Sequence, residues 1–116
     1  MSENSYLPEG QLIASVENIE FFSSPSALER AMQQGRILEA LAVLCDGEMN
    51  LVVDLCCMKG IIRKNEVAYT LDGENIKDIA VISRVGKAVC FKVLSIEKDQ
   101  SGQPYAILSR RAAQLE

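Results

Sequence analysis

Residues 49–67, MNLVVDLCCMKGIIRKNEV, decide the fold of this chain. Two apolar runs rich in β-branched side chains, 51–55 and 61–62, lie on either side of the short segment 56–60. Such runs separated by a short turn that contains glycine are typical of a β-hairpin. We therefore expect two neighbouring antiparallel strands, with the turn at 56–60 and Gly60 supplying its permissive backbone.

Further strands are predicted on both sides of this hairpin. Residues 36–45 form an apolar run that indicates one long strand before it. After it, residues 87–96 alternate between apolar and more polar positions, as in a strand with one buried face. The polar segment 99–102 then predicts a hairpin loop into a last strand at 103–110. Five strands with one longer connection, between the third and fourth, predict a closed barrel of the oligonucleotide/oligosaccharide-binding (OB) type.

An arm at residues 1–34 precedes the predicted barrel domain at 35–116. Its most distinct element is a helix at about 24–34, which ends before Gly35. Two N-terminal caps fit the sequence: Ser24 followed by Pro25, or Ser26 with Glu29 three residues later. Two short strands, at 12–14 and 19–22, are also expected in this arm.

The net negative charge of the chain lies in the arm, and the barrel domain is neutral. Residues 1–34 carry one basic and five acidic side chains, whereas residues 35–116 carry eleven of each. A neutral body does not by itself indicate a nucleic-acid partner, because such binders usually have a basic patch or a high isoelectric point. It does not exclude one, since the bases can gather on one face.

Composition and missing residue types exclude several functions. Apolar residues make up 48% of the chain and charged residues 24%, as in ordinary globular domains. No secretory leader or apolar span is visible, so we expect a cytoplasmic protein without membrane contact. There are four cysteines and no histidine, so we expect reduced thiols and no metal or other cofactor. No glycine-rich phosphate loop or nucleophile motif is present, and we predict no enzymatic activity.

Short motifs in a fixed order resemble the RNA-binding repeat of the large ribosomal protein S1. The resemblance covers residues 35–114. In chain order, these motifs are Val53-Asp54-Leu55, Lys59-Gly60-Ile61-Ile62, Arg84-Val85-Gly86-Lys87, Phe91-Lys92-Val93 and Leu108-Ser109-Arg110-Arg111-Ala112. The family implies a five-stranded OB barrel that binds single-stranded RNA on one face. Stacking aromatics and basic side chains share such faces.

The chain departs from the family at several positions of that face. Val52 and Met49 stand where family members often have aromatic residues, and Cys56 replaces a glycine. Arg63 replaces a common histidine, and its guanidinium is able both to stack and to contact phosphate. Tyr105 remains as a ring for stacking. The resemblance therefore implies weak RNA binding.

The predicted RNA-binding residues follow from this resemblance and from the distribution of bases. They are Arg63, Lys64, Tyr105, Val52, Met49, Arg36, Lys59 and Arg110.

Two functions remain open at this point. The first is weak, sequence-tolerant binding of single-stranded RNA, near the ribosome or on messenger RNA. The alternative is a protein-docking module on an OB barrel that has lost RNA binding; its partner would be the ribosome or another RNA-associated protein. Homodimerisation through the short N-terminal strands is a further alternative.

Overall fold

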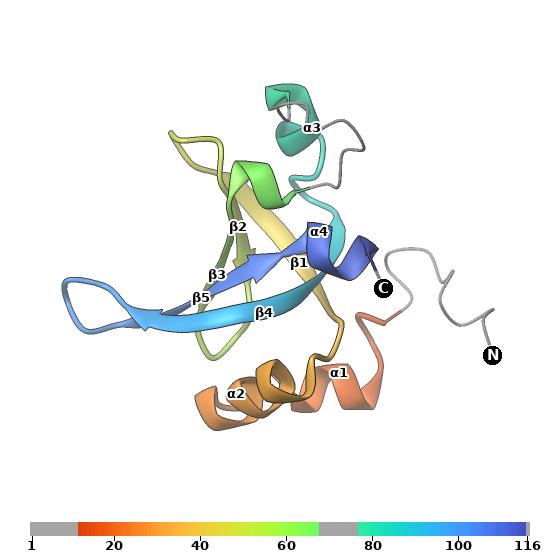
Figure 1. The fold of residues 1–116 in the computed structure, drawn as a ribbon, viewed down its shortest axis with the longest axis vertical. Helices are drawn as coiled ribbons and strands as arrows, with labels where there is room; N and C mark the ends of the chain where they lie inside the picture. Colours follow the sequence, from red (N-terminus) through yellow and green to blue (C-terminus); the bar gives the residue numbers. More distant parts are fainter. Residues whose placement is uncertain (1–11, 68–76, 116) are drawn as a thin grey trace.

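A computed structural model describes residues 12–67 and 77–115, which form a five-stranded barrel with short helices around it (Figure 1). Helices α1 and α2 lie at one end of the barrel and α3 at the other (Figure 1). In chain order the elements are α1 (Val16–Glu20), α2 (Pro25–Gln34), β1 (Leu38–Cys45), β2 (Leu51–Asp54), β3 (Lys59–Ile62), the 3₁₀ turn η2 (Lys64–Glu66), α3 (Asp78–Ile82), β4 (Ala88–Lys98), β5 (Pro104–Ser109) and α4 (Arg110–Gln114). No helix in the described ranges is long and apolar enough to cross a membrane.

The strand order is β1-β2-β3-β5-β4, and β4 pairs with β1 to close the barrel. All neighbours are antiparallel except β3 and β5, which are parallel. This is the arrangement of an OB fold. The predicted fold class, a mainly β five-stranded barrel with a helix before it, is confirmed.

The β2–β3 hairpin forms as predicted, but its turn is shorter. Strand β3 begins at Lys59, so Gly60 pairs with Val53 inside the ladder instead of making the turn. The left-handed backbone conformation belongs to Cys56, whose φ is 69°. Glycine is needed at 60 for space, because a Cβ there would lie 2.5 Å from the Leu108 side chain of β5. The prediction that Gly60 supplies the turn is therefore wrong.

Helix α2 covers one end of the barrel. Ser24 is its N-cap, since its hydroxyl accepts a hydrogen bond from the Ala27 N–H at 3.1 Å, and Gly35 ends it in a left-handed conformation. Leu28 is fully buried, and the ring of Phe22 lies 6.4 Å from that of Phe91 in β4. The side chains of the arm and of the barrel thus share one core.

The two short strands expected at 12–14 and 19–22 are absent. Residues 16–20 form α1 instead, because the Ser15 hydroxyl caps the Asn18 N–H, and Phe21 and Phe22 follow in a turn. Both phenylalanines are buried, which a strand with alternating faces would not achieve for consecutive side chains. The strands on which the homodimer alternative depended are therefore not formed, and homodimerisation stays a prediction.

Candidate nucleic-acid interface

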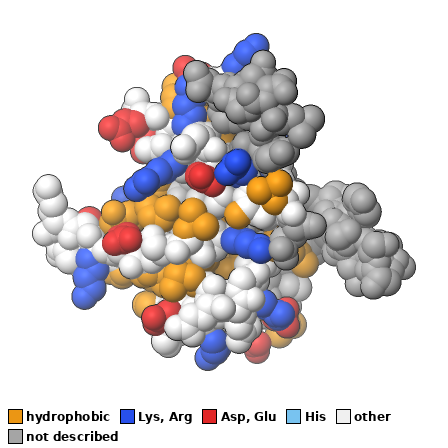
Figure 2. All heavy atoms as spheres, viewed as in Figure 1, with side chains coloured by type: hydrophobic (Ala, Val, Ile, Leu, Met, Phe, Trp, Pro, Cys, Tyr) orange, Lys and Arg blue, Asp and Glu red, His pale blue; other side chains and the backbone are white. Residues whose placement is uncertain are grey.

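An open hollow of about 320 Å³ lies on the outer face of the barrel, and we name it the β3–β5 groove. Its floor comes from β3 and β5, and its walls come from the β1–β2 and β4–β5 loops. Figure 2 shows hydrophobic side chains gathered over the β4–β5 side of the barrel, with lysine, arginine and carboxylate groups at their border. The lining residues are Asp46, Glu48, Asn50, Lys59, Ile61, Arg63, Asp99, Tyr105 and Ile107.

Strand register brings the predicted cations and the aromatic ring together. In the parallel β3–β5 ladder, Lys59 is the partner of Tyr105, and Ile61 is the partner of Ile107. Since side chains alternate along a strand, Lys59, Ile61 and the following Arg63 point to the same outer face. The groove therefore has an aliphatic floor, one half-buried tyrosine and two exposed cations.

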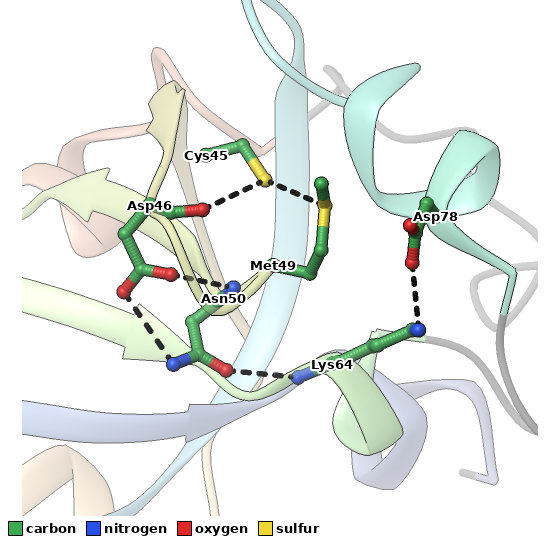
Figure 3. A network of polar contacts seen from close by, with 6 residues as sticks. All are labelled: Cys45, Asp46, Met49, Asn50, Lys64 and Asp78. Atoms are coloured by element: carbon green, nitrogen blue, oxygen red, sulfur yellow. Dashed lines mark hydrogen bonds and ion pairs between the residues drawn. The ribbon is translucent and has the colours of Figure 1, made fainter.

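One wall of the groove is built around Asp46 (Figure 3). Its carboxylate accepts hydrogen bonds from the N–H groups of Glu48 and Asn50, both at 2.9 Å. The bond from Asn50 is the main reason that the pKa of Asp46 lies below its usual value. Asn50 in turn accepts a hydrogen bond from the Lys64 N–H at 3.2 Å, which ties the wall to the end of β3.

The opposite wall is built around a second aspartate. Asp99 accepts hydrogen bonds from the hydroxyl and the N–H of Ser101 and from the N–H of Gln103, at 2.8–2.9 Å. The Ser101 hydroxyl is the main cause that lowers the pKa of Asp99. Both wall aspartates are therefore charged at neutral pH.

The groove thus carries charges of both signs. Glu48 and the two aspartates line it together with Lys59 and Arg63, and the charge of Lys59 helps to lower the pKa of both aspartates. Carboxylates repel phosphate, so the lining does not form a uniformly basic track. Any contact with a nucleic-acid backbone depends on the two cations and on their distance from the carboxylates.

The structure brings three of the predicted binding residues into the groove: Arg63, Tyr105 and Lys59. Val52 lies beside them, in a hollow of about 270 Å³ that Lys59 also lines. Met49 is not among the residues that line the groove, and its sulfur lies 3.5 Å from the thiol of Cys45, the last residue of β1 (Figure 3).

Three other predicted residues have partners elsewhere. The Lys64 ammonium group pairs with Asp78 of α3 at 2.7 Å (Figure 3). Arg36 pairs with Glu17 and lies 5.5 Å over the ring of Phe21, at the α1–α2 end of the barrel.

Arg110 is the first residue of α4, and it contacts the residue that follows η2. Its guanidinium donates to the Val67 carbonyl at 2.9 Å and ties α4 to the segment after β3. The structure therefore does not gather Lys64, Arg36 or Arg110 in the groove.

Sequence reasoning missed the aliphatic floor and the acidic walls. Alternation along β3 and β5 was a usable signal for Ile61 and Ile107, because each lies two residues from a predicted site residue. The sequence around Asp46 and Asp99 indicates only turns. No sequence pattern near either residue shows that the two loops face the same groove.

Among solved structures, the solution structure of GSP13 from Bacillus subtilis is similar to this chain. The two sequences are 23% identical, the match covers 71% of this chain and 58% of GSP13, and the TM-score is 0.50. The two chains share the barrel fold. At 58%, the matched part spans less than two thirds of the length of GSP13. No family model and no curated protein matches the sequence.

Proposed function

We propose that this chain is an S1-like nucleic-acid-binding domain that binds single-stranded RNA weakly, and with little sequence preference, in the β3–β5 groove. The observation that carries the proposal is the parallel register that sets Lys59 beside Tyr105, with Arg63 in the same groove. A ring flanked by cations is the combination that single-strand binders use to stack a base and hold its phosphate. An association with the ribosome or messenger RNA is part of the proposal.

Weak affinity follows from the number and kind of contacts. A single ring contributes roughly 1–3 kcal/mol through stacking on one base. Ile61 and Ile107 add apolar contact but no π face. The two cations work against three carboxylates in the same groove, so the phosphate contribution is small.

The choice of a single strand over a duplex follows from the shape of the groove. Tyr105 is half-buried on the floor between two loops, so an unpaired base has to enter the groove to stack on it. Bases in a duplex are already stacked and paired, and unstacking them costs a few kcal/mol. The proposed preference is therefore for unpaired RNA.

The test is a titration of the full chain into fluorescent single-stranded RNA, with double-stranded DNA as the control, at low and at physiological salt. We expect binding to the RNA, with a salt slope of roughly −1.4 in log–log form for two phosphate contacts. Tyr105→Ala should weaken binding by about tenfold, in line with the loss of one stacked base. Lys87→Gln is the matched control, because Lys87 is an exposed cation that does not line the groove.

A second candidate, a protein-docking module without RNA binding, is favoured by the acidic walls and by the valine at position 52. Absence of RNA binding at low salt, or equal losses in the Tyr105→Ala and Lys87→Gln variants, would contradict the RNA proposal and favour this one.

A further inference from the structure

A second hollow, of about 400 Å³, lies between α1, β1 and the turn after β2, and we name it the α1–β1 hollow. It shares no lining residue with the β3–β5 groove. Its lining is mainly apolar, with Ile13, Ile19, Phe22, Ala40 and Leu41 as the hydrophobic members. Ile19 and Leu41 are 56% and 46% exposed, so aliphatic surface faces solvent at its mouth.

The apolar surface continues along the outer face of the barrel. A neighbouring hollow of about 270 Å³ is lined by the apolar residues Val43, Val52, Val53 and Met58 and by Lys59, the cross-strand partner of Asp54, and it shares Asp54 and Cys56 with the α1–β1 hollow. Leu41 and Val43 are alternate residues of β1, so both side chains point outward. The two hollows form one aliphatic track over β1 and β2.

Charge at the α1 end of this track is acidic. The α1–β1 hollow is lined by two acidic residues, Glu39 and Asp54. None of the described residues that line it is basic. Glu39 is buried and accepts a hydrogen bond from the Leu12 N–H, whereas Asp54 is exposed where the two hollows meet. Glu20 adds an exposed carboxylate next to Ile19 on α1. Two copies of this end brought together would repel each other, while a cationic partner would be attracted.

The backbone of the barrel limits how a partner can bind here. Strand β1 pairs with β4 over 38–41 and with β2 over 42–45, and the Asn18 side chain occupies the backbone groups of Glu39 within the hollow, so an added strand finds its edge taken there. A partner must therefore insert side chains, as an amphipathic helix does when its apolar face enters a groove.

We propose that the α1–β1 hollow docks a cationic amphipathic helix of a partner protein. Leucine-like side chains of that helix fill the hollow against Ile19 and Leu41, and its lysines or arginines contact Asp54 and Glu20. The α1–β1 hollow shares no lining residue with the RNA groove, but the neighbouring hollow meets that groove at Lys59, so the two partners bind adjoining surfaces of one barrel.

The test measures fluorescence anisotropy of a labelled synthetic peptide with leucine and lysine at helical spacing, titrated with the full chain. A peptide of the same pattern with glutamate in place of lysine is the charge control. We expect the leucine–lysine peptide to bind about tenfold more tightly than the leucine–glutamate peptide. Asp54→Asn keeps an oxygen for the Cys56 N–H, which now donates to Asp54 at 2.9 Å, and it should weaken binding of the lysine peptide several-fold.

Apolar variants test the location. Ile19→Ser and Leu41→Ser should each weaken binding of the lysine peptide by about tenfold. Leu94→Ser is the matched control, because Leu94 is 49% exposed on β4 and lines neither hollow. Equal binding of the two peptides, or an equal loss in the Leu94→Ser variant, would overturn the proposal.

Two other occupants have their own outcomes. A dimer in sedimentation experiments that Leu41→Ser abolishes would overturn the proposal in favour of a second copy of this chain. A synthetic peptide of residues 1–11 that binds more tightly than the lysine peptide would overturn it in favour of the N-terminal segment.

Discussion

Asn18 of α1 binds the backbone of Glu39 in β1 in both directions. Its side-chain N–H₂ donates to the Glu39 carbonyl at 2.9 Å, and the Glu39 N–H donates to its side-chain oxygen at 2.8 Å. Both residues are buried. The amide of Asn18 thus acts as a short piece of neighbouring strand, and it satisfies backbone groups that would otherwise be buried without partners.

Replacing this amide should cost stability. We expect Asn18→Leu to lower the free energy of unfolding by about 1–3 kcal/mol, because the Glu39 N–H and carbonyl lose their partners in a buried site. Urea unfolding followed by circular dichroism measures the change. Glu20→Gln, at an exposed position on the same helix, is the control and should leave stability unchanged. A wild-type midpoint for Asn18→Leu would mean that the two bonds do not hold α1 on the barrel.

The glycine in β3 is expected to be intolerant of a methyl group. Gly60→Ala places a Cβ against the Leu108 side chain and should destabilise the barrel by about 1–3 kcal/mol through overpacking. Gly47→Ala is the matched control, since no atom lies within 4 Å of a Cβ there, and its effect should be small. Thermal unfolding of both variants measures the difference. Similar melting temperatures would show that Leu108 moves aside without cost.

The left-handed backbone conformation of Cys56, which follows β2, leads us to expect that glycine at this position stabilises the fold. Cys56 is exposed and has a φ of 69°, a conformation that glycine adopts without strain. We expect Cys56→Gly to raise the free energy of unfolding by roughly 1 kcal/mol. Cys57→Gly, where φ is not positive, should lower it. Chemical unfolding of the two variants separates strain relief from a general effect of glycine, and a loss in both would argue against strain at Cys56.

We expect the contribution of Asp46 to the free energy of unfolding to depend on pH. Its pKa is lowered in the folded chain, mainly by the hydrogen bond from the Asn50 N–H, so its charged form is favoured by folding. The stabilisation is fully present above the unfolded pKa, about 3.9, and is lost as the pH falls through the lower folded value. The stability difference between the wild type and Asp46→Asn should therefore be larger at pH 7 than at pH 2. Urea unfolding at both values measures it, and a constant difference would mean that Asp46 titrates normally.

Neighbouring cations should differ in their effect on RNA. Arg63 lines the β3–β5 groove, whereas the Lys64 ammonium pairs with Asp78 outside it. We expect Arg63→Gln to weaken RNA binding several-fold and to reduce the salt slope by roughly 0.7, and Lys64→Gln to leave both nearly unchanged. Anisotropy titrations at two salt concentrations compare them. A larger loss for Lys64→Gln would show that the RNA follows the α3 side of the barrel.

Local patterns were sufficient for much of the fold. The alternation of Val89, Phe91 and Val93 in β4 and the Ser24 and Gly35 ends of α2 depend on residues a few positions apart. Side-chain period and capping chemistry act over that range, and they set strands and helix ends before tertiary contacts form. The same reasoning failed at 19–22, where a serine cap and two buried phenylalanines favoured a helix and a turn.

The sequence by itself thus determined the barrel, its helix α2 and the chemistry of its outer residues. Only the tertiary structure decided that β3 lies parallel to β5, so that Lys59 meets Tyr105, and that Asp46 and Asp99 wall the same groove. It also decided that Gly60 is needed for space and that Lys64, Arg36 and Arg110 have partners outside the groove. These relationships join residues far apart in the chain, and their energies depend on packing that no local pattern encodes.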